Sequence, residues 1–232
     1  LNNEKNINTL APYKLVKTMR AGVLVLGSLL AKYRKAKVSL PGGCAIGSRP
    51  VDLHLFALKK LGAKIKIKDG YILAEAKKGL TGTIVNFPSI SVGATENALI
   101  AATKANGKTI LKNCAIEPEI TDLITFLRKL GFIINLKGRT ITVSKNKVKS
   151  SNVVHKVIFD RIELGTYIIA GALLAKKKLI IDKIIPKVVK NEIKILKTIG
   201  VKIKEKKTSL IIKSNKKLKK ISITTKPYPG FP

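Results

Sequence analysis

The sequence predicts an α/β fold built from three copies of a structural unit of about 70 residues. In each copy an amphipathic helix ends in an apolar residue followed by glycine, and a strand with period-2 alternation comes next. The three glycines are Gly62, Gly131 and Gly200, which recur at equal intervals along the chain. This spacing exceeds the periods of about 20–50 residues typical of solenoids, so each copy is interpreted as a supersecondary block.

Each copy is expected to contain a helix, a strand, a second helix and two closing strands. The first helices are expected at 15–32, 94–105 and 163–175. The strands that follow them are expected at 38–40, 109–111 and 179–181. The second helices and the strands after them cover the glycine segments 58–65, 127–134 and 196–203. The last strands are expected at 71–76, 140–144 and 209–213.

A change in composition divides the chain into two parts. Residues 145–152 are polar and poor in helix-forming patterns, which places a boundary near 157–160 and predicts domains at 1–158 and 159–232. The chain opens with Leu1, its single methionine is Met19, and it ends in the turn-rich stretch 227–232. We interpret it as a fragment of a longer protein.

The charge balance is strongly basic, with 46 Lys and Arg against 13 Asp and Glu and a net charge of +33. Such a surplus attracts polyanions, so nucleic-acid binding is one reading. Only six of the 46 are arginines, and there is no tryptophan or aromatic run on which bases would stack. The pattern favours a lysine-rich composition on solvated faces.

The apolar stretches and the cysteines indicate a cytosolic protein. The longest apolar stretches, 21–31 and 167–175, reach about half of the ~20 residues that a transmembrane helix needs. The two cysteines are too few for a disulfide framework or a thiolate metal cage, and the first residues are polar, unlike a signal peptide. A reducing cytoplasmic setting fits best.

One irregular stretch contains a candidate reactive cysteine. Residues 39–54 read SLPGGCAIGSRPVDLH, in which three glycines and a proline predict a loop that leads into a helix near Ser48. Cys44 therefore lies shortly before a helix N-terminus and close to Arg49 in sequence. Both features favour a thiolate, and such a thiol both donates a proton and adds to electrophilic carbon. The alternative is a small buried cysteine beside a tight turn.

Two further features frame this hypothesis. Cys114 follows a strand with no glycine loop beside it and is expected to be inert core. The stretch SVGATEN at 91–97 opens a helix, where backbone N–H groups and Gly93 suit a phosphate. A plain serine N-cap explains the same pattern. In the third copy Asp160 and Glu163 open the matching helix, where they fit simple capping.

Residues 41–54, PGGCAIGSRPVDLH, resemble the cysteine loop of the UDP-N-acetylglucosamine enolpyruvyl transferase (1-carboxyvinyltransferase) family. Supporting matches are KTMRA at 17–21, SVGATEN at 91–97, EPEI at 117–120, DRIE at 160–163 and PYPGFP at 227–232. The resemblance runs along the whole chain. It implies the enolpyruvyl transferase fold, an inside-out α/β barrel of two domains with three repeats each and a cleft between them. The barrel is incomplete here, with two repeats in 1–158 and one in 159–232.

The resemblance also implies an activity. The family moves the enolpyruvyl group of phosphoenolpyruvate to the 3-hydroxyl of UDP-N-acetylglucosamine and releases phosphate, the first committed step of peptidoglycan synthesis. This implies a cytoplasmic transferase of cell wall biogenesis, tied to cell shape, the cell cycle and cell division. No cofactor, metal, nucleic acid or membrane partner is implied, and the oligomeric state is not predicted.

By resemblance, Cys44 donates a proton to the methylene carbon, forms a covalent adduct and is the residue alkylated by fosfomycin. Both substrates are polyanions, for which arginine forks are suited, and Arg20 and Arg49 are the arginines expected at the site. The uridine pocket is implied to be lined by Arg49, Pro50, Val51, Asp52 and Leu53, with Asp52 accepting a base N–H. The diphosphate is implied to bind backbone donors of Ser91, Val92 and Gly93. His54 either assists this anion site or is structural.

The chain departs from the family pattern in three places. A Lys-Asn pair that binds phosphoenolpyruvate would precede Leu1, and an essential aspartate would follow Pro232. A lysine common before the SVG stretch is Ser89 here. We therefore expect the isolated segment to be inactive.

Three alternatives stay open at this point. The shikimate-pathway enolpyruvyl transferase shares the repeats and the donor, but it lacks the cysteine loop, so Cys44 discriminates. A basic nucleic-acid-binding protein would show a salt-dependent shift with DNA and none with the nucleotide sugar. A degenerate, non-catalytic relative is disfavoured because Cys44 and Arg49 are both in place.

Overall fold

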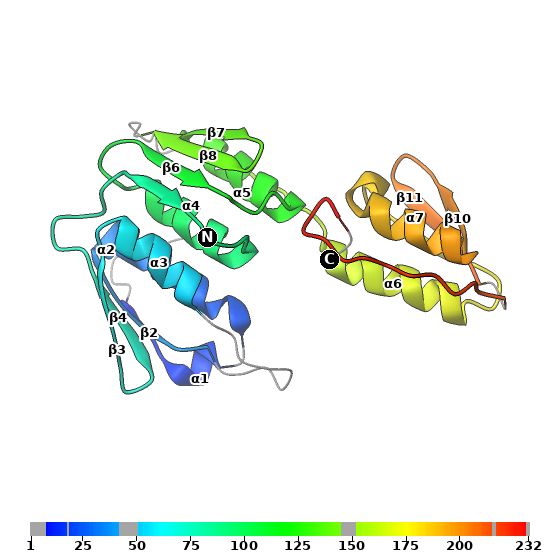
Figure 1. Ribbon diagram of the computed structural model, residues 1–232, viewed down its shortest axis with the longest axis horizontal. Coiled ribbons are helices and arrows are strands. Elements are labelled where there is room, and N and C mark those ends of the chain that lie inside the picture. Colours follow the sequence, from blue (N-terminus) through cyan, green and yellow to red (C-terminus); the bar gives the residue numbers. More distant parts are fainter. Residues whose placement is uncertain (1–7, 18, 42–50, 145–151, 215–216, 231–232) are drawn as a thin grey trace. The chain divides into compact units, whose positions relative to one another are not determined.

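A computed structural model describes residues 8–17, 19–41, 51–144, 152–214 and 217–230, with the backbone alone for Arg20 (Figure 1). The chain divides into two compact units, Leu1–His155 and Lys156–Pro232. Every described lysine is exposed, in agreement with the solvated faces expected from the composition. No helix within the described ranges is both long and apolar enough to cross a lipid bilayer.

The first unit opens with one complete repeat. Its elements are β1 (Leu10–Ala11), α1 (Tyr13–Val16), η1 (Arg20–Leu24), α2 (Val25–Tyr33), β2 (Lys35–Ser39), α3 (Asp52–Lys60), β3 (Lys64–Lys68) and β4 (Tyr71–Glu75). The strands form one sheet in the order β1-β2-β4-β3. β1 pairs with β2 in parallel, and the other pairs are antiparallel.

The second repeat of this unit has the same plan. Its elements are β5 (Ile84–Asn86), α4 (Val92–Ala102), β6 (Thr109–Lys112), α5 (Pro118–Lys129), β7 (Ile133–Lys137) and β8 (Thr140–Ser144). The sheet order is β5-β6-β8-β7, again with a parallel first pair and antiparallel pairs after it. The expected order of helix, strand, helix, strand, strand is confirmed in both repeats, and each gains an unpredicted leading strand.

The central helices of the first unit lie between its two sheets (Figure 1). Figure 1 shows α2, α3 and α4 grouped between the two sheets. α4 is the most enclosed helix, with buried residues on several faces: Ala94, Thr95, Asn97, Ala98, Leu99, Ala101 and Ala102. A helix that is apolar nearly all round needs cover on every side, and small side chains let neighbouring helices approach it closely.

The second unit holds the third repeat. Its elements are α6 (Arg161–Leu174), β9 (Leu179–Asp182), η2 (Pro186–Val189), α7 (Lys190–Ile199), β10 (Lys202–Glu205) and β11 (Ser209–Lys213). The sheet order β10-β11-β9 repeats the antiparallel part of the first two sheets. Its core is smaller and includes Leu164 and Ile168 of α6 with Leu210 and Ile212 of β11.

The three glycines that mark the repeats end their helices in the predicted way. Gly62, Gly131 and Gly200 have φ angles of 94°, 95° and 110°. Residues with a Cβ rarely adopt this left-handed conformation, whereas glycine adopts it at little cost and lets the chain turn directly into a strand. The prediction based on these glycines is confirmed.

The predicted single helix at 15–32 is wrong. The chain forms α1 and then, after an extended residue at Met19 (φ −136°, ψ 110°), η1 and α2. A Cβ at Gly22 would lie 3.0 Å from Cγ1 of the buried Val16, so the chain folds back tightly there. The helical periodicity on which the prediction depended does not indicate this close approach of residues six apart in sequence.

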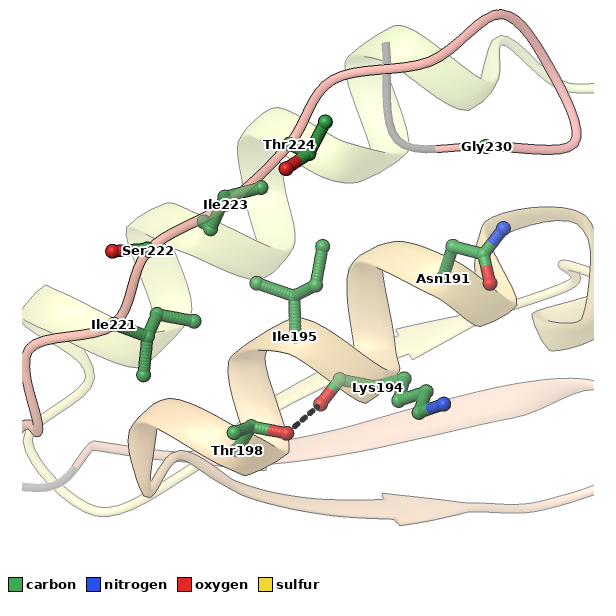
Figure 2. A pocket seen from close by; sticks show the side chains of 9 residues that line it. All are labelled: Asn191, Lys194, Ile195, Thr198, Ile221, Ser222, Ile223, Thr224 and Gly230. Carbon is green, nitrogen blue, oxygen red and sulfur yellow. Dashed lines mark hydrogen bonds between the residues drawn. The ribbon is translucent and has the colours of Figure 1, made fainter.

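In the second unit, the C-terminal segment runs along α7 and leaves an apolar groove of about 580 Å³ (Figure 2). Ile195 of α7 points toward the segment, which carries Ile221 and Ile223. The N–H of Lys219 donates to the carbonyl of Ile199, and the Asn191 amide donates to the carbonyl of Pro229. Lys194 is the one charged side chain among the described groove residues.

Candidate active site

A cavity of about 650 Å³ opens in the first unit where η1, α3 and α4 begin. Its described lining residues are Ala21, Val23, Leu24, Pro41, Val51, Asp52, Leu53, His54, Ile90, Ser91, Val92, Gly93 and Glu96. Two helix N-termini therefore face one space. Their N–H groups have no partners within the helices, and their dipoles favour negative charge, so the cavity is suited to an anionic ligand.

The start of α4 is set by its capping residue. Ser91 is extended (φ −144°, ψ 124°), and its hydroxyl accepts a hydrogen bond from the Ala94 N–H at 3.3 Å. The Thr95 hydroxyl donates to the Ser91 carbonyl at 2.7 Å. These contacts fix the turn of Ser91, Val92 and Gly93, which lines the cavity. The backbone N–H groups of this turn are those of a helix N-terminus, which commonly binds anions.

The start of α3 brings a second segment to the cavity. The helix begins at Asp52, whose carboxylate lies in the first turn, where the helix dipole favours negative charge. Val51 precedes it without a side-chain cap, and Leu53 is half-buried. Pro41 lies on the same cavity, so the described residues on both sides of 42–50 line it.

His54 and Gly93 meet at the base of this site. His54 is 9% exposed, and its Nδ1 lies 3.0 Å from the amide nitrogen of Asn97. A Cβ at Gly93 would lie 3.2 Å from Cε1 and 3.4 Å from Nε2 of His54. Glycine at 93 thus allows the imidazole edge to approach the first turn of α4 closely.

Glu96 brings a titratable carboxyl to the same cavity. Its burial, followed by the negative charges of Glu119 and Glu117, raises the pKa of Glu96 to about 7. A carboxyl with such a pKa exchanges protons near neutrality, which is a property of groups in functional sites. Sequence analysis missed this residue, although an acid within the apolar helix VGATENALIAA is a detectable signal.

The cavity collects most of the sequence-predicted site residues that the structure describes. Six of them line it together: Val51, Asp52, Leu53, Ser91, Val92 and Gly93. The backbone of Arg20 opens η1, which contributes three lining residues, while its side chain lies outside the description. Cys44, Arg49 and Pro50 also lie outside the described residues.

Cys114 provides the contrast expected for a structural cysteine. It is fully buried, and burial raises the pKa of its thiol to about 12. Its N–H donates to the Arg139 carbonyl at 2.9 Å, and the Arg139 guanidinium donates back to the Cys114 carbonyl at 3.0 Å. A thiol held neutral in the core is a poor nucleophile. Within the described part of the chain no cluster of three or more His, Cys, Asp or Glu residues is placed to hold a metal ion.

Comparisons with known proteins identify the family of the chain. The family model of EPSP synthase (3-phosphoshikimate 1-carboxyvinyltransferase) matches residues 1–232. The chain belongs to this family. It is 56% identical to a UDP-N-acetylglucosamine 1-carboxyvinyltransferase of Pelagibacter ubique over the whole chain and 55% of that relative. A protein of the same name from Endomicrobium trichonymphae is 48% identical over 96% of the chain and 53% of its own length.

Two solved structures show the fold. The enolpyruvyl transferase NikO from Streptomyces tendae matches with a TM-score of 0.75 and 21% identity, over 97% of this chain and 54% of that one. EPSP synthase from Acinetobacter baumannii matches with a TM-score of 0.61 and 18% identity, over 83% of this chain and 46% of that one. The predicted enolpyruvyl transferase fold is confirmed. The chain spans about half the length of the curated relatives it matches. Since these relatives are named as enzymes, the nucleic-acid-binding alternative is not favoured.

Proposed function

We propose that this chain carries the cysteine-loop part of an enzyme that transfers the enolpyruvyl group of phosphoenolpyruvate to the 3-hydroxyl of UDP-N-acetylglucosamine. The observation that carries the proposal is 56% identity, across the whole chain, with a relative named for this activity. The residues 1–158 would then supply two repeats of one domain and 159–232 the first repeat of the next.

The reaction is an addition followed by an elimination. The sugar hydroxyl gives up its proton to a base as its oxygen adds to C2 of phosphoenolpyruvate, and a second proton is added to the C3 methylene. Loss of a proton from C3 and of phosphate from C2 then restores the double bond. Cys44 is proposed as the group that protonates C3, because the helix that follows it and Arg49, which is close in sequence, favour a thiolate, and such a thiol exchanges a proton readily. The same thiolate forms a covalent adduct and would be alkylated by fosfomycin.

The nucleotide sugar is proposed to occupy the cavity at the starts of α3 and α4. Backbone donors of Ser91, Val92 and Gly93 would bind the diphosphate, as helix N-termini commonly do. The uridine would contact Pro50, Val51 and Leu53, and Asp52 would accept a base N–H. In support, the two predicted substrate segments are distant from each other in sequence and yet line one cavity.

The phosphate and carboxylate groups of the two proposed substrates are negatively charged and need cationic side chains. Arg20 and Arg49 are proposed to bind the phosphate and carboxylate groups, since a guanidinium pairs with both in a forked geometry. The proposal places the enzyme in the cytoplasm, where thiols stay reduced, and in peptidoglycan synthesis, with its consequences for cell shape and division.

The test measures phosphate release from phosphoenolpyruvate and UDP-N-acetylglucosamine by a chain of the relatives' full length that contains these 232 residues. Wild type and Cys114→Ala are expected to release phosphate, whereas Cys44→Ala is expected to lose at least about 1,000-fold in rate. Normal turnover by Cys44→Ala would refute the role of that thiol. The isolated chain is expected to be inactive, and turnover by it would overturn that expectation.

A further inference from the structure

Three buried polar contacts meet at the Asn97 side chain, which is fully buried in α4. The N–H of Gly27 donates to Asn97 Oδ1 at 2.7 Å, and Asn97 Nδ2 donates to the Val23 carbonyl at 3.1 Å. The second N–H of Nδ2 faces His54 Nδ1 at 3.0 Å. The amide thus joins η1, α2 and α3 to α4 with both of its donor hydrogens engaged.

The orientation of this amide is fixed by the backbone. Gly27 offers only an N–H, which needs an acceptor, and the carbonyl of Val23 needs a donor. Exchanging the positions of the amide oxygen and nitrogen would set a donor against Gly27 and an acceptor against Val23, and would leave both buried groups unsatisfied. Gly27 also permits the contact sterically, because a Cβ there would lie 2.2 Å from Oδ1. An N–H of Asn97 is therefore directed at His54.

This orientation determines which histidine nitrogen carries the proton. His54 Nδ1 faces a donor and must accept, so the neutral ring carries its hydrogen on Nε2. Nε2 lies on the side of the ring next to Gly93, in the first turn of α4. The ring edge beside the cavity is then an N–H donor, which suits an anion held at that turn.

We propose that Asn97 is a positioning residue that holds His54 in the Nε2–H tautomer, so that this N–H donates to the diphosphate bound at the start of α4. The assignment of the ligand rests on the proposed function, whereas the tautomer follows from the contacts alone. Asn97 itself would touch no substrate and would act only through the imidazole.

The tautomer is tested by ¹⁵N NMR of the histidine-labelled chain. The chain has two histidines, so a His155→Gln variant assigns the signals. At neutral pH we expect an unprotonated Nδ1 and a protonated Nε2 for His54. A protonated Nδ1 would overturn the proposal without any further variant being made.

An Asn97→Asp variant tests whether Asn97 is the cause. The carboxylate can still accept from Gly27, but its other oxygen faces His54 and favours a proton on Nδ1. We expect His54 Nδ1 to become protonated in this variant and to stay unprotonated in Asn113→Asp. Asn113 is a matched control because its Nδ2 donates to the Phe87 carbonyl at 2.9 Å, away from His54. A folded Asn97→Asp protein with the wild-type tautomer would refute the role of Asn97.

The donor role is tested by adding UDP to a histidine-labelled chain of the relatives' full length, assigned with His54→Gln. UDP is expected to shift the His54 Nε2–H signal and to leave that of His155 in place. UDP binding without a shift at His54 would overturn the donation to the diphosphate. Failure of UDP to bind would refute the proposed substrate class, and with it the ligand assigned to His54, while the tautomer measurement would stand by itself.

Discussion

The starts of α4 and α6 are the same position of the repeat in two different environments. Each has a capping side chain: Ser91 accepts from Ala94, and Asp160 accepts from Ile162 and Glu163. Six residues after each cap the two differ. Asn97 is fully buried and its side chain contacts three neighbouring segments, whereas Thr166 is exposed and its hydroxyl donates to Ile162 of its own helix.

The difference shows what turns a helix start into a candidate site. Both starts offer backbone donors, but among the residues that the structure describes only the start of α4 has a second helix start and a buried polar contact beside it. On α6 the apolar residues Ile162 and Leu173 are 59% and 61% exposed. The repeat pattern therefore determines where a capped helix begins. Whether that helix start forms a candidate site depends on residues that are distant in sequence.

The largest expected effect on stability comes from a substitution that places a side chain in the space that Asn97 occupies. In Gly27→Ala the new Cβ would meet Asn97 Oδ1 at 2.2 Å and its backbone oxygen at 2.5 Å, so α2 and α4 must separate. We expect a loss of about 3 kcal/mol in the free energy of unfolding, from overpacking and broken hydrogen bonds, measured by denaturant titration.

Gly165→Ala in α6 is the matched control for that substitution. Apart from its chain neighbours and the backbone of its own helix, no heavy atom of the described residues lies within 4 Å of its Cβ position, so the variant is expected to be more stable by about 0.5–1 kcal/mol through helix propensity. Equal effects of the two substitutions would contradict the contrast between α4 and α6.

The next largest expected effect is a pH-dependent change in stability caused by Glu96. The pKa of its carboxyl in the folded chain is about 7, above the usual 4.5. The folded state therefore binds more protons than the unfolded state between these values, and Glu96 costs stability increasingly as the pH rises through this window. Because the cost is fully developed above pH 7, we expect Glu96→Gln to gain about 1–3 kcal/mol at pH 8 and little at pH 4.

Thermal unfolding across this pH range checks the prediction. Glu163→Gln in the first turn of α6 serves as the control and is expected to change stability by only a few tenths of a kcal/mol at any pH. A gain for Glu96→Gln that does not vary with pH would contradict the assigned cause.

The smallest expected effects on stability come from removing the capping side chains of α4 and α6. Ser91→Ala and Asp160→Ala each remove a capping side chain and are expected to cost about 1 kcal/mol in unfolding free energy. UDP affinity, measured by calorimetry on a chain of the relatives' full length, is expected to fall only in Ser91→Ala. A comparable fall in Asp160→Ala would mean that the start of α6 also contributes to the ligand site.

Local patterns predicted the repeat well. The glycine turns and the strands Thr140–Ser144 and Ser209–Lys213 depend on short-range rules, and their bounds agree with the structure. The helix predicted at 15–32 failed because a contact between Val16 and Gly22 folds the chain back. The leading strands β1 and β5 were missed because they are short and exist only through pairing with β2 and β6.

The candidate site was predictable only in part. Val51, Asp52 and Ser91 were found through the family resemblance, which follows the order of residues along the chain. Asn97 was not, since its partners Gly27 and His54 lie 70 and 43 residues away and nothing local indicates the pairing. Glu96 offered a local signal, as an acid in an apolar helix, but its raised pKa depends on burial and on acids of another segment.

The most direct test of the account is the choice of acceptor by a chain of the relatives' full length. Phosphate release from phosphoenolpyruvate is measured with UDP-N-acetylglucosamine and, separately, with 3-phosphoshikimate. The account predicts release with the nucleotide sugar alone. Release with 3-phosphoshikimate, or with neither acceptor, would contradict it.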